Sequence, residues 1–217
     1  TSYTCYSYLT TGRSTFSVPI DVICDFLIVG GGGGGGMDMG GGGGAGGVVY
    51  GTNQTLLAGT YNITVGAGGD GSPEGPGVAG GFPPPVFSSF YNAINGQDSS
   101  FNGYIATGGG HGGSSKWTNA GAGNVDTSGA GGGSGGGTSG FNSGHVSGMG
   151  TGLGGASAQL DYNGITDISG YGNVGGENDG GSYEYYSGGG GGAGTPGKNG
   201  YNVRPNPADG GDGIEID

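Results

Sequence analysis

Hydrophobic and polar residues alternate with a period of two between residues 16 and 28. Alternation of this kind predicts a strand with one buried face. Pro19 interrupts the stretch, and because proline cannot donate to a strand ladder, we expect a half-buried strand pair bent at Pro19. The positions predicted to face inward are Phe16, Val18, Ile20, Val22, Cys24, Phe26 and Ile28.

Four shorter stretches have the same character. Residues 3–9 predict a first strand, residues 60–65 a strand with Asn62 facing outward, residues 99–107 a short strand, and residues 213–216 a closing strand. No stretch has the spacing of an amphipathic helix. The chain is therefore expected to consist of strands and irregular segments, without an α-helix.

Glycine runs follow these strands directly. Residues 30–36 are all glycine, and residues 40–47 are glycine apart from Ala45. Glycine loses the most backbone entropy on ordering and buries no side chain, so such a run makes neither a stable α-helix nor a stable strand. A left-handed polyproline II helix, with about 3 residues per turn, has no internal hydrogen bonds and must bond to neighbouring helices. Further glycine-rich segments cover residues 108–113, 129–140, 148–155 and 188–194.

The composition favours an ordered bundle of such helices. Glycine accounts for 66 of the 217 residues and proline for 9. This proportion often marks a disordered chain, but only 9% of the residues are charged, and 13 tyrosines and 7 phenylalanines accompany the strand patterns. Collagen is excluded, because proline is scarce and the Gly-X-Y triplet is not maintained.

The charge excludes one class of partner. The net charge is −12, so a nucleic-acid-binding surface is not expected. No apolar run approaches the roughly 20 residues of a membrane-spanning helix. The basic residues are Arg13, Lys116, Lys198 and Arg204.

Several features are typical of a secreted protein. The chain begins at Thr1 rather than methionine, as expected of a processed mature chain. Cys5 and Cys24 lie on predicted neighbouring strands, which favours a disulfide between them, although Cys24 also fits a small buried hydrophobe. Asn53 and Asn62 each begin an Asn-x-Thr sequon and are predicted glycan carriers.

The order of these motifs resembles a glycine-rich domain family of phage tail proteins and of bacterial and environmental surface proteins. The family has a Phe-x-Val-Pro strand, a strand entering polyglycine, a Gly-Thr-Tyr-x-Val-Thr-Val-type strand, a Ser-Ser-Phe strand and a terminal Gly-Ile-x-Ile strand. Similar polyglycine bundles form phage tail-fibre-tip adhesins and the glycine-rich region of the anaplastic lymphoma kinase receptor. The matching residues are 16–19, 25–36, 59–69, 99–110 and 213–216.

The resemblance implies a small β-sandwich-like base with a bundle of left-handed polyglycine II helices and no α-helix. We therefore expect a single glycine-rich domain over residues 1–217. Within it, residues 1–29 form the N-terminal strands, residues 30–213 the glycine helices with interspersed strands and loops, and residues 214–217 the closing strand. The resemblance implies no enzymatic activity.

No catalytic or metal-binding motif is predicted. The Gly-x-Ser-x-Gly match around Ser134 lies in a glycine tract, without the strand and helix that a nucleophile elbow requires. His111 and His145 each lack metal-ligand spacing. The acidic end of the chain is interpreted as solvated, with calcium as the one cofactor to weigh. Its residues are Asp209, Asp212, Glu215 and Asp217.

Two functional hypotheses remain from the sequence. The first is a non-enzymatic extracellular structural protein that assembles with copies of itself into a filament. The second is an adhesin on a virion or cell surface that contacts surface glycans or outer-membrane receptors through exposed loops. An ice-binding role needs a flat face of short side chains, against which the tyrosine-rich insertions argue. The predicted ligand-contact tyrosines are Tyr171, Tyr183, Tyr185 and Tyr186.

Overall fold

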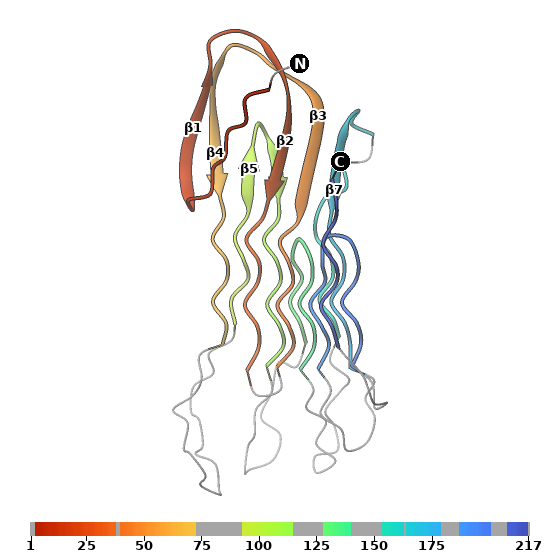
Figure 1. Ribbon diagram of the computed structural model, residues 1–217. Helices are drawn as coiled ribbons and strands as arrows, with labels where there is room; N and C mark the ends of the chain where they lie inside the picture. Colours follow the sequence, from red (N-terminus) through yellow and green to blue (C-terminus); the bar gives the residue numbers. More distant parts are fainter. Residues whose placement is uncertain are drawn as a thin grey trace, which may run out of the picture.

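The computed structural model describes residues 3–37, 40–72, 93–114, 128–139, 153–162, 164–178, 187–200 and 208–216. Within these ranges the chain forms seven β-strands and no helix, which confirms the predicted β and irregular fold class. The strands gather at one end of the molecule, and the glycine segments extend from them side by side (Figure 1). The strands are β1 (Gly12–Val18), β2 (Val22–Val29), β3 (Val48–Leu56), β4 (Gly59–Val65), β5 (Ser99–Phe101), β6 (Tyr104–Ala106) and β7 (Ile168–Tyr171).

The strands form two antiparallel sheets. One has the order β1-β4-β5-β6 and the other the order β2-β3-β7. The long alternating stretch does give two strands, separated by residues 19–21, but the prediction that they pair with each other is wrong. β1 pairs with β4 and β2 pairs with β3, because each finds its partner in a segment far along the chain. β1 and β2 are consequently the outermost strands of their sheets.

The hydrophobic core lies between the two sheets. Phe26 of β2 packs edge-on against Phe101 of β5, with ring centroids 5.6 Å apart, and against Tyr104 of β6 at 5.3 Å. Phe26 and Ile28 are buried, which confirms the predicted inward parity in this part of β2. Ile20 is exposed instead, because it lies in the connection between β1 and β2 rather than in a strand.

The glycine segments bond to one another with a period of three residues. Every third residue of the run 30–36 donates its N–H to the segment 41–47, and the residues one place further along donate to the segment 94–97. A three-residue repeat is that of a polyproline II helix, in which every third residue faces the same neighbour. The donor–acceptor pairs are Gly30–Gly47, Gly33–Gly44, Gly36–Gly41, Gly31–Gln97 and Gly34–Ile94, all at 2.9–3.0 Å.

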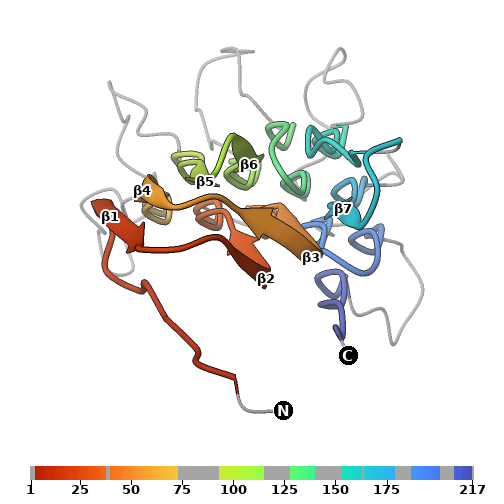
Figure 2. The same ribbon diagram turned by 90° about the horizontal axis from the view of Figure 1, so that it is seen from above.

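The strands lead directly into these segments. Residues 30–36 continue β2, residues 66–72 continue β4, and residues 40–47 lead into β3 (Figure 1). Seen end-on, the segments appear as coils set side by side below the sheets (Figure 2). The segment 208–216 belongs to this set, so the predicted closing strand at residues 213–216 is wrong. Its glycines bond to other glycine segments instead, as Gly211 does to the Gly190 carbonyl at 2.8 Å.

We expect Gly33→Ala to destabilise the protein much more than Gly32→Ala. A Cβ on Gly33 would collide with the backbone carbonyl of Gly110, whereas the nearest atom to a Cβ on Gly32 would be the Gly44 oxygen at 3.8 Å. Because the obstacle at Gly33 is backbone, it cannot rotate away, and the expected loss is about 1–3 kcal/mol, as for an overpacked core. Thermal melting followed by circular dichroism compares the variants, and equal melting temperatures would contradict the close packing of the bundle.

Candidate functional site: the arm and the open sandwich edge

Residues 3–11 form a segment, here called the arm, that joins no sheet. The predicted strand at residues 3–9 is therefore wrong, since none of its residues belongs to a strand or makes a backbone hydrogen bond to another described residue. The arm leaves the lower end of β1 and passes in front of the sandwich (Figures 1 and 2). The N–H and C=O groups of the arm thus lack partners among the described residues. The region beside the unpaired edges of β1 and β2 is here called the opening between β1 and β2.

Gly12 sets the direction of the arm. This first residue of β1 has a φ of 113°, a conformation that residues with a side chain rarely adopt. The turn at Gly12 takes the preceding residues out of line with β1 and prevents them from extending that strand. The arm is therefore joined to the sandwich through a backbone position that suits glycine.

An aromatic contact seats the arm on the sandwich. The Tyr6 and Phe16 ring centroids are 5.1 Å apart. Phe16 lies opposite Tyr61 in the β1–β4 register, Tyr61 lies 5.9 Å from Phe101, and Phe101 packs on Phe26 of the other sheet. Directly opposed residues share one face of a sheet, so Phe16 and Tyr61 belong to the inner face. Tyr6 therefore occupies the inner side of the opening between β1 and β2.

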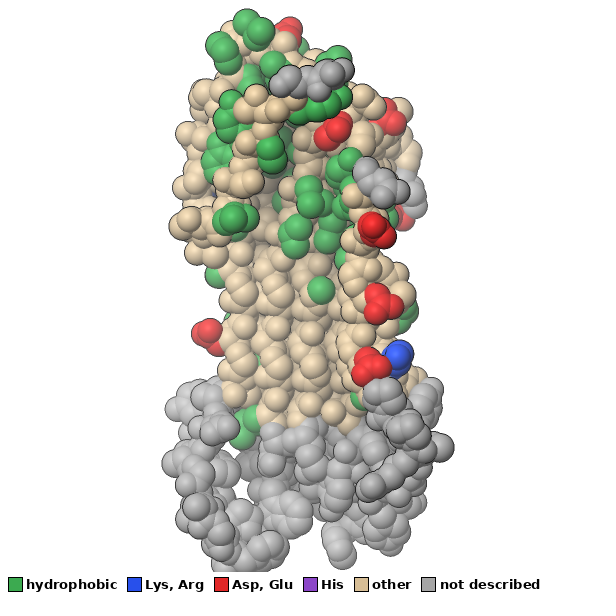
Figure 3. Space-filling model, viewed as in Figure 1, with side chains coloured by type: hydrophobic (Ala, Val, Ile, Leu, Met, Phe, Trp, Pro, Cys, Tyr) green, Lys and Arg blue, Asp and Glu red, His purple; other side chains and the backbone are tan. Residues whose placement is uncertain are grey.

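Hydrophobic side chains are exposed on both sides of this opening. Ile23, Leu27 and Val29 point away from the core on β2 and are 73%, 56% and 53% exposed, and Tyr3 and Leu9 of the arm are each 87% exposed. Figure 3 shows the hydrophobic surface gathered over the sandwich, with little of it on the visible face of the glycine segments. Grouped exposed apolar side chains on a folded protein are typical of an interaction surface.

The alternation of hydrophobic and polar residues did not predict the apolar outer face of β2, although the sequence contains a signal for it. Residues 26–29 are Phe-Leu-Ile-Val, apolar at both parities. A strand that is apolar on both faces is typical of one covered on both. The structure covers one face with the sandwich core and leaves the other exposed.

The predicted disulfide between Cys5 and Cys24 is absent from the structure, in which both thiols are free. Cys5 is exposed on the arm, whereas Cys24 is half-buried on β2. The prediction relied on the first segment being a strand next to β2, and the arm makes no such pairing. Burial raises the pKa of the Cys24 thiol, with a smaller contribution from the neighbouring Asp25 carboxylate.

Both predicted glycan carriers lie on the surface. Asn62 is exposed on β4, opposite Thr15 of β1, while its neighbour Ile63 is buried. Asn53 is exposed at an irregularity in the β2–β3 pairing, with a φ of 52°, and its N–H donates to Asp25 Oδ1 at 2.8 Å. The outward direction predicted for Asn62 is therefore confirmed, and its glycosylation stays a prediction.

The four tyrosines predicted to contact a ligand do not form a described loop. Tyr171 ends β7, opposite Val48 of β3, and is half-buried. It therefore belongs to a strand and not to the exposed loop that was expected. Tyr183, Tyr185 and Tyr186 lie outside the described residues.

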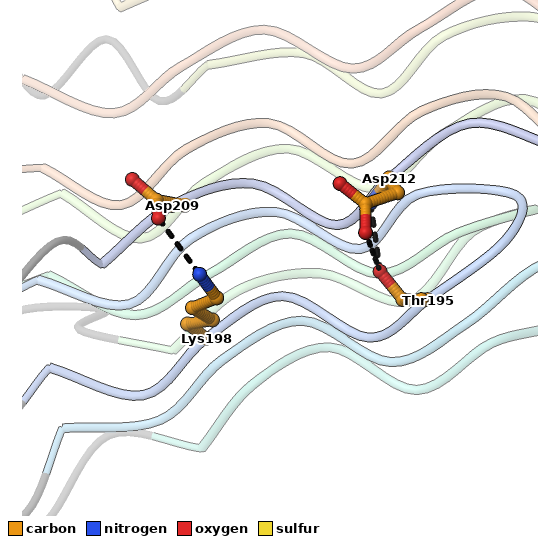
Figure 4. Close-up of polar contacts among 4 residues, drawn as sticks. All are labelled: Thr195, Lys198, Asp209 and Asp212. Carbon is orange, nitrogen blue, oxygen red and sulfur yellow. Dashed lines mark hydrogen bonds and ion pairs between the residues drawn. The ribbon is translucent and has the colours of Figure 1, made fainter.

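Acidic residues near the end of the chain hold adjacent glycine segments together (Figure 4). Asp209 Oδ2 lies 2.8 Å from Lys198 Nζ, and this hydrogen bond raises the pKa of the lysine. Thr195 Oγ1 donates to Asp212 Oδ2 at 3.4 Å and accepts from the Asp212 N–H at 2.7 Å. Across the described ranges, no three His, Cys, Asp or Glu side chains come together so as to hold a metal ion. Asp217 lies outside those ranges, so calcium binding at this end of the chain stays a hypothesis.

Ser134 and His111 both lie in the glycine bundle. Ser134 is fully buried, and its Oγ donates to the Gly192 carbonyl at 3.0 Å. The N–H of His111 donates to Asn95 Oδ1 at 2.8 Å. The buried hydroxyl contact gives Ser134 a packing role, whereas the His111 contact is made by its backbone. His145 lies outside the described residues.

Comparison with known proteins identifies the family of the domain. The model of a family described as a glycine-rich domain matches residues 9–216. No curated protein and no solved structure matches the chain. In the part of the chain that the structure describes, no helix is long and apolar enough to cross a membrane. The family match begins near the end of the arm, so residues 3–8 lie outside it.

We expect Cys24 to be alkylated more slowly than Cys5 at neutral pH. Only the thiolate reacts, and the raised pKa of Cys24 leaves less of its thiolate at neutral pH. The Cys24 rate should rise steeply as the pH approaches that pKa. Iodoacetamide labelling followed by peptide mass spectrometry measures both rates, and Cys5→Ser serves as the control that leaves the Cys24 rate unchanged. Equal rates, or a disulfide in the untreated protein, would show that the thiols are not arranged in this way.

We expect a glycan on Asn62, and secondarily on Asn53, in material from a glycosylating source. Asn62 is exposed in a regular strand, and its sequon is not interrupted by proline. Peptide mass spectrometry of native material checks the modification, with Asn62→Gln as the matched control. An unmodified mass for the peptide that spans residues 60–65 would remove this claim.

Proposed function

Since the chain belongs to the glycine-rich domain family over nearly its whole length, we propose that it is a non-enzymatic structural protein, the repeating subunit of an extracellular or surface filament. The observation that carries the proposal is the arm. Its backbone has no partner among the described residues, its hydrophobic side chains are exposed, and it lies next to two strands that pair on one side only within the described part of the chain. An unpaired strand edge is a template for pairing with another chain.

The distribution of hydrophobic surface supports assembly through the sandwich rather than through the bundle. The glycine segments have almost no side chains with which to associate by hydrophobic burial. Among the described residues, exposed large hydrophobic side chains are concentrated on β2, on the arm and on the connections next to them. The others, among them Ile94, Leu153 and Val174, are spread over separate segments. Extended segments that add to an open sheet edge gain main-chain hydrogen bonds as well as side-chain contacts. Copies of this chain are therefore the partner that we propose.

The geometry favours an open polymer. A contact between the arm of one subunit and the edge of another joins two different surfaces, and such contacts continue indefinitely unless the rotation between subunits closes a ring. The glycine segments, bonded to their neighbours at every turn, would serve as a rigid body between such contacts. The net charge of −12 would keep unassembled subunits soluble.

The adhesin is the alternative hypothesis. It depends on exposed loops that recognise surface glycans or receptors. Of the tyrosines proposed for that contact, Tyr171 is half-buried in β7, and the other three lie outside the described residues. The experiment that tests the filament also tests this alternative.

We expect the full chain to form helical fibres at high concentration, as seen by negative-stain electron microscopy. Deletion of residues 1–11 should give soluble monomers with a nearly unchanged melting temperature, because residues 3–11 make no backbone hydrogen bond to another described residue. Ile165→Ser is the control, since Ile165 is exposed but precedes β7, at the far edge of its sheet from β2.

The outcomes separate the hypotheses. A full chain that stays as single particles at high concentration would overturn the filament and favour the adhesin. A truncated chain that polymerises normally would show that the arm is not the connector.

A further inference from the structure

We propose that the opening between β1 and β2 is an acceptor site for one β-strand, and that its occupant is the arm of a second copy of this chain. This inference rests on the proposed function, because it names the contact through which subunits join. Four features of the sandwich and the arm lead to it.

The first feature is the unequal size of the two sheets. One sheet has four strands and the other three. Across the core, β5 and β6 face β2 and β3, so β1 and β4 extend beyond the β2 edge (Figure 2). The inner faces of β1 and β4 carry Phe16 and Tyr61, which remain half-buried and have no described strand opposite them. A strand added to the edge of β2 would cover both rings.

The second feature is the width of the opening. β1 ends at Val18 and β2 begins at Val22, so four residue steps connect the two edges at this end. Four steps reach at most about 14 Å. β1 and β2 belong to facing sheets. Packed sheets lie about 10 Å apart, and neighbouring strands of one sheet lie about 4.8 Å apart. The connection therefore limits β1 to roughly two strand spacings beyond β2, which corresponds to at most one added strand between them.

The third feature is that the chain's own arm reaches the opening without closing it. Tyr6 touches Phe16, yet it remains 64% exposed, and the arm forms no backbone hydrogen bond to a described residue. Its attachment limits it. The arm lies alongside β1 and runs in the opposite direction to it (Figure 1). If the arm paired with β2, the two strands would be parallel, and parallel pairing is less stable than antiparallel pairing.

The fourth feature is the chemistry of the arm. Residues 3–11 include three tyrosines, one leucine and three threonines, and no charged residue or proline. Aromatic and β-branched residues suit a strand, and an uncharged strand enters an apolar opening at little desolvation cost. The family match starts only at residue 9, so most of the arm is not part of the shared domain. These observations point to a segment that serves a neighbour rather than its own domain.

An arm from a second copy has no attachment to the β1 that flanks the opening. It can therefore enter antiparallel to β2 and adopt the register that buries its rings against Phe16 and Tyr61. Exchange of an identical element between copies is domain swapping, and here each copy both donates an arm and accepts one. The exposed outer face of β2, with Ile23 and Leu27, lies next to the site and would contact the body of the donor.

Cross-linking in the full chain tests this contact directly. Unlabelled and ¹⁵N-labelled subunits, each with a benzophenone amino acid in place of Tyr6, are mixed before assembly and then irradiated. We expect cross-links from the arm to peptides of β1 and β2, joining labelled to unlabelled chains at the frequency of random mixing. The same photo-reactive group in place of Ile165 is the control and should not reach those peptides.

The outcomes distinguish this inference from the filament proposal. If fibres form but the photo-reactive group in place of Tyr6 cross-links only within single chains, arm exchange is overturned and the filament proposal stands. Fibres with cross-links between chains at other peptides would also overturn the acceptor site. If no fibres form, the proposed function fails, and the exchange fails with it.

A point substitution supplies an independent measurement. Tyr6→Ser should raise the critical concentration for assembly roughly tenfold, because an aromatic contact buried only in the assembled state is lost. Thr4→Ser is the matched control on the same arm and should leave it nearly unchanged. Both variants should melt like the parent as monomers, since neither side chain is buried in the free subunit. An unchanged critical concentration for Tyr6→Ser would contradict burial of this ring in the acceptor site.

Discussion

The buried backbone polar groups of the glycine segments depend on partners in other segments. An extended helix with three residues per turn has no internal hydrogen bonds, so each N–H and C=O must be satisfied by a neighbouring segment or, at the surface, by water. The segments achieve this only because their backbones nearly touch, and a Cβ at most of their positions would collide with a neighbouring carbonyl. The exceptions lie on the outside. Ala45, which interrupts the second run, is exposed, and Gly32 and Gly35 have room for a Cβ.

This dependence explains why the molecule has two distinct parts. A lattice of glycine backbone has no side chains with which to make a hydrophobic core, so its segments need another element to bring them into register. The sandwich does this, since β2 and β4 run directly into glycine segments and the segment 40–47 runs directly into β3. Its core is small. Phe26 packs with aliphatic residues, and the partly buried Phe101 and Tyr104 pack against it. The order of the strands therefore decides which glycine segments become neighbours.

The sandwich also carries the strand edge and the arm through which we propose that subunits associate. Natural sheets usually protect their edges with lysine, proline or bulges. β2 has no lysine or proline, and Pro19 lies in the connection before it rather than in the strand. The irregularity at Asn53 is on the β3 side, so it leaves the open edge of β2 unprotected. Together with the unpaired arm, this edge makes the sandwich the connecting part of the molecule and the bundle its rigid part.

Local pattern in the sequence was enough to predict several elements. The period of the hydrophobic side chains predicts the strands at 60–65 and within 16–29 and the absence of helix. The lack of side chains in the glycine runs predicts that these runs pack against one another. The exposed position of Asn62 and the burial of Phe26 follow from the same alternation. The family could also be identified, because its motifs occur in order along the chain.

Tertiary structure alone decided which segments pair. Residues 3–9 and 213–216 have strand-like composition, yet neither pairs with a described strand. Gly12 turns the first segment away from β1, and the second continues a segment whose residues 209–212 bond to the glycine bundle. β1 and β2 are consecutive in the chain but join different sheets, so the open edge between them could not be seen in the sequence. The same holds for Cys5 and Cys24, whose separation follows from the path of the arm. A strand pattern states which side chains can be buried, whereas the hydrogen-bond partner that makes it a strand lies elsewhere in the chain, or, as we propose for the arm, in another molecule.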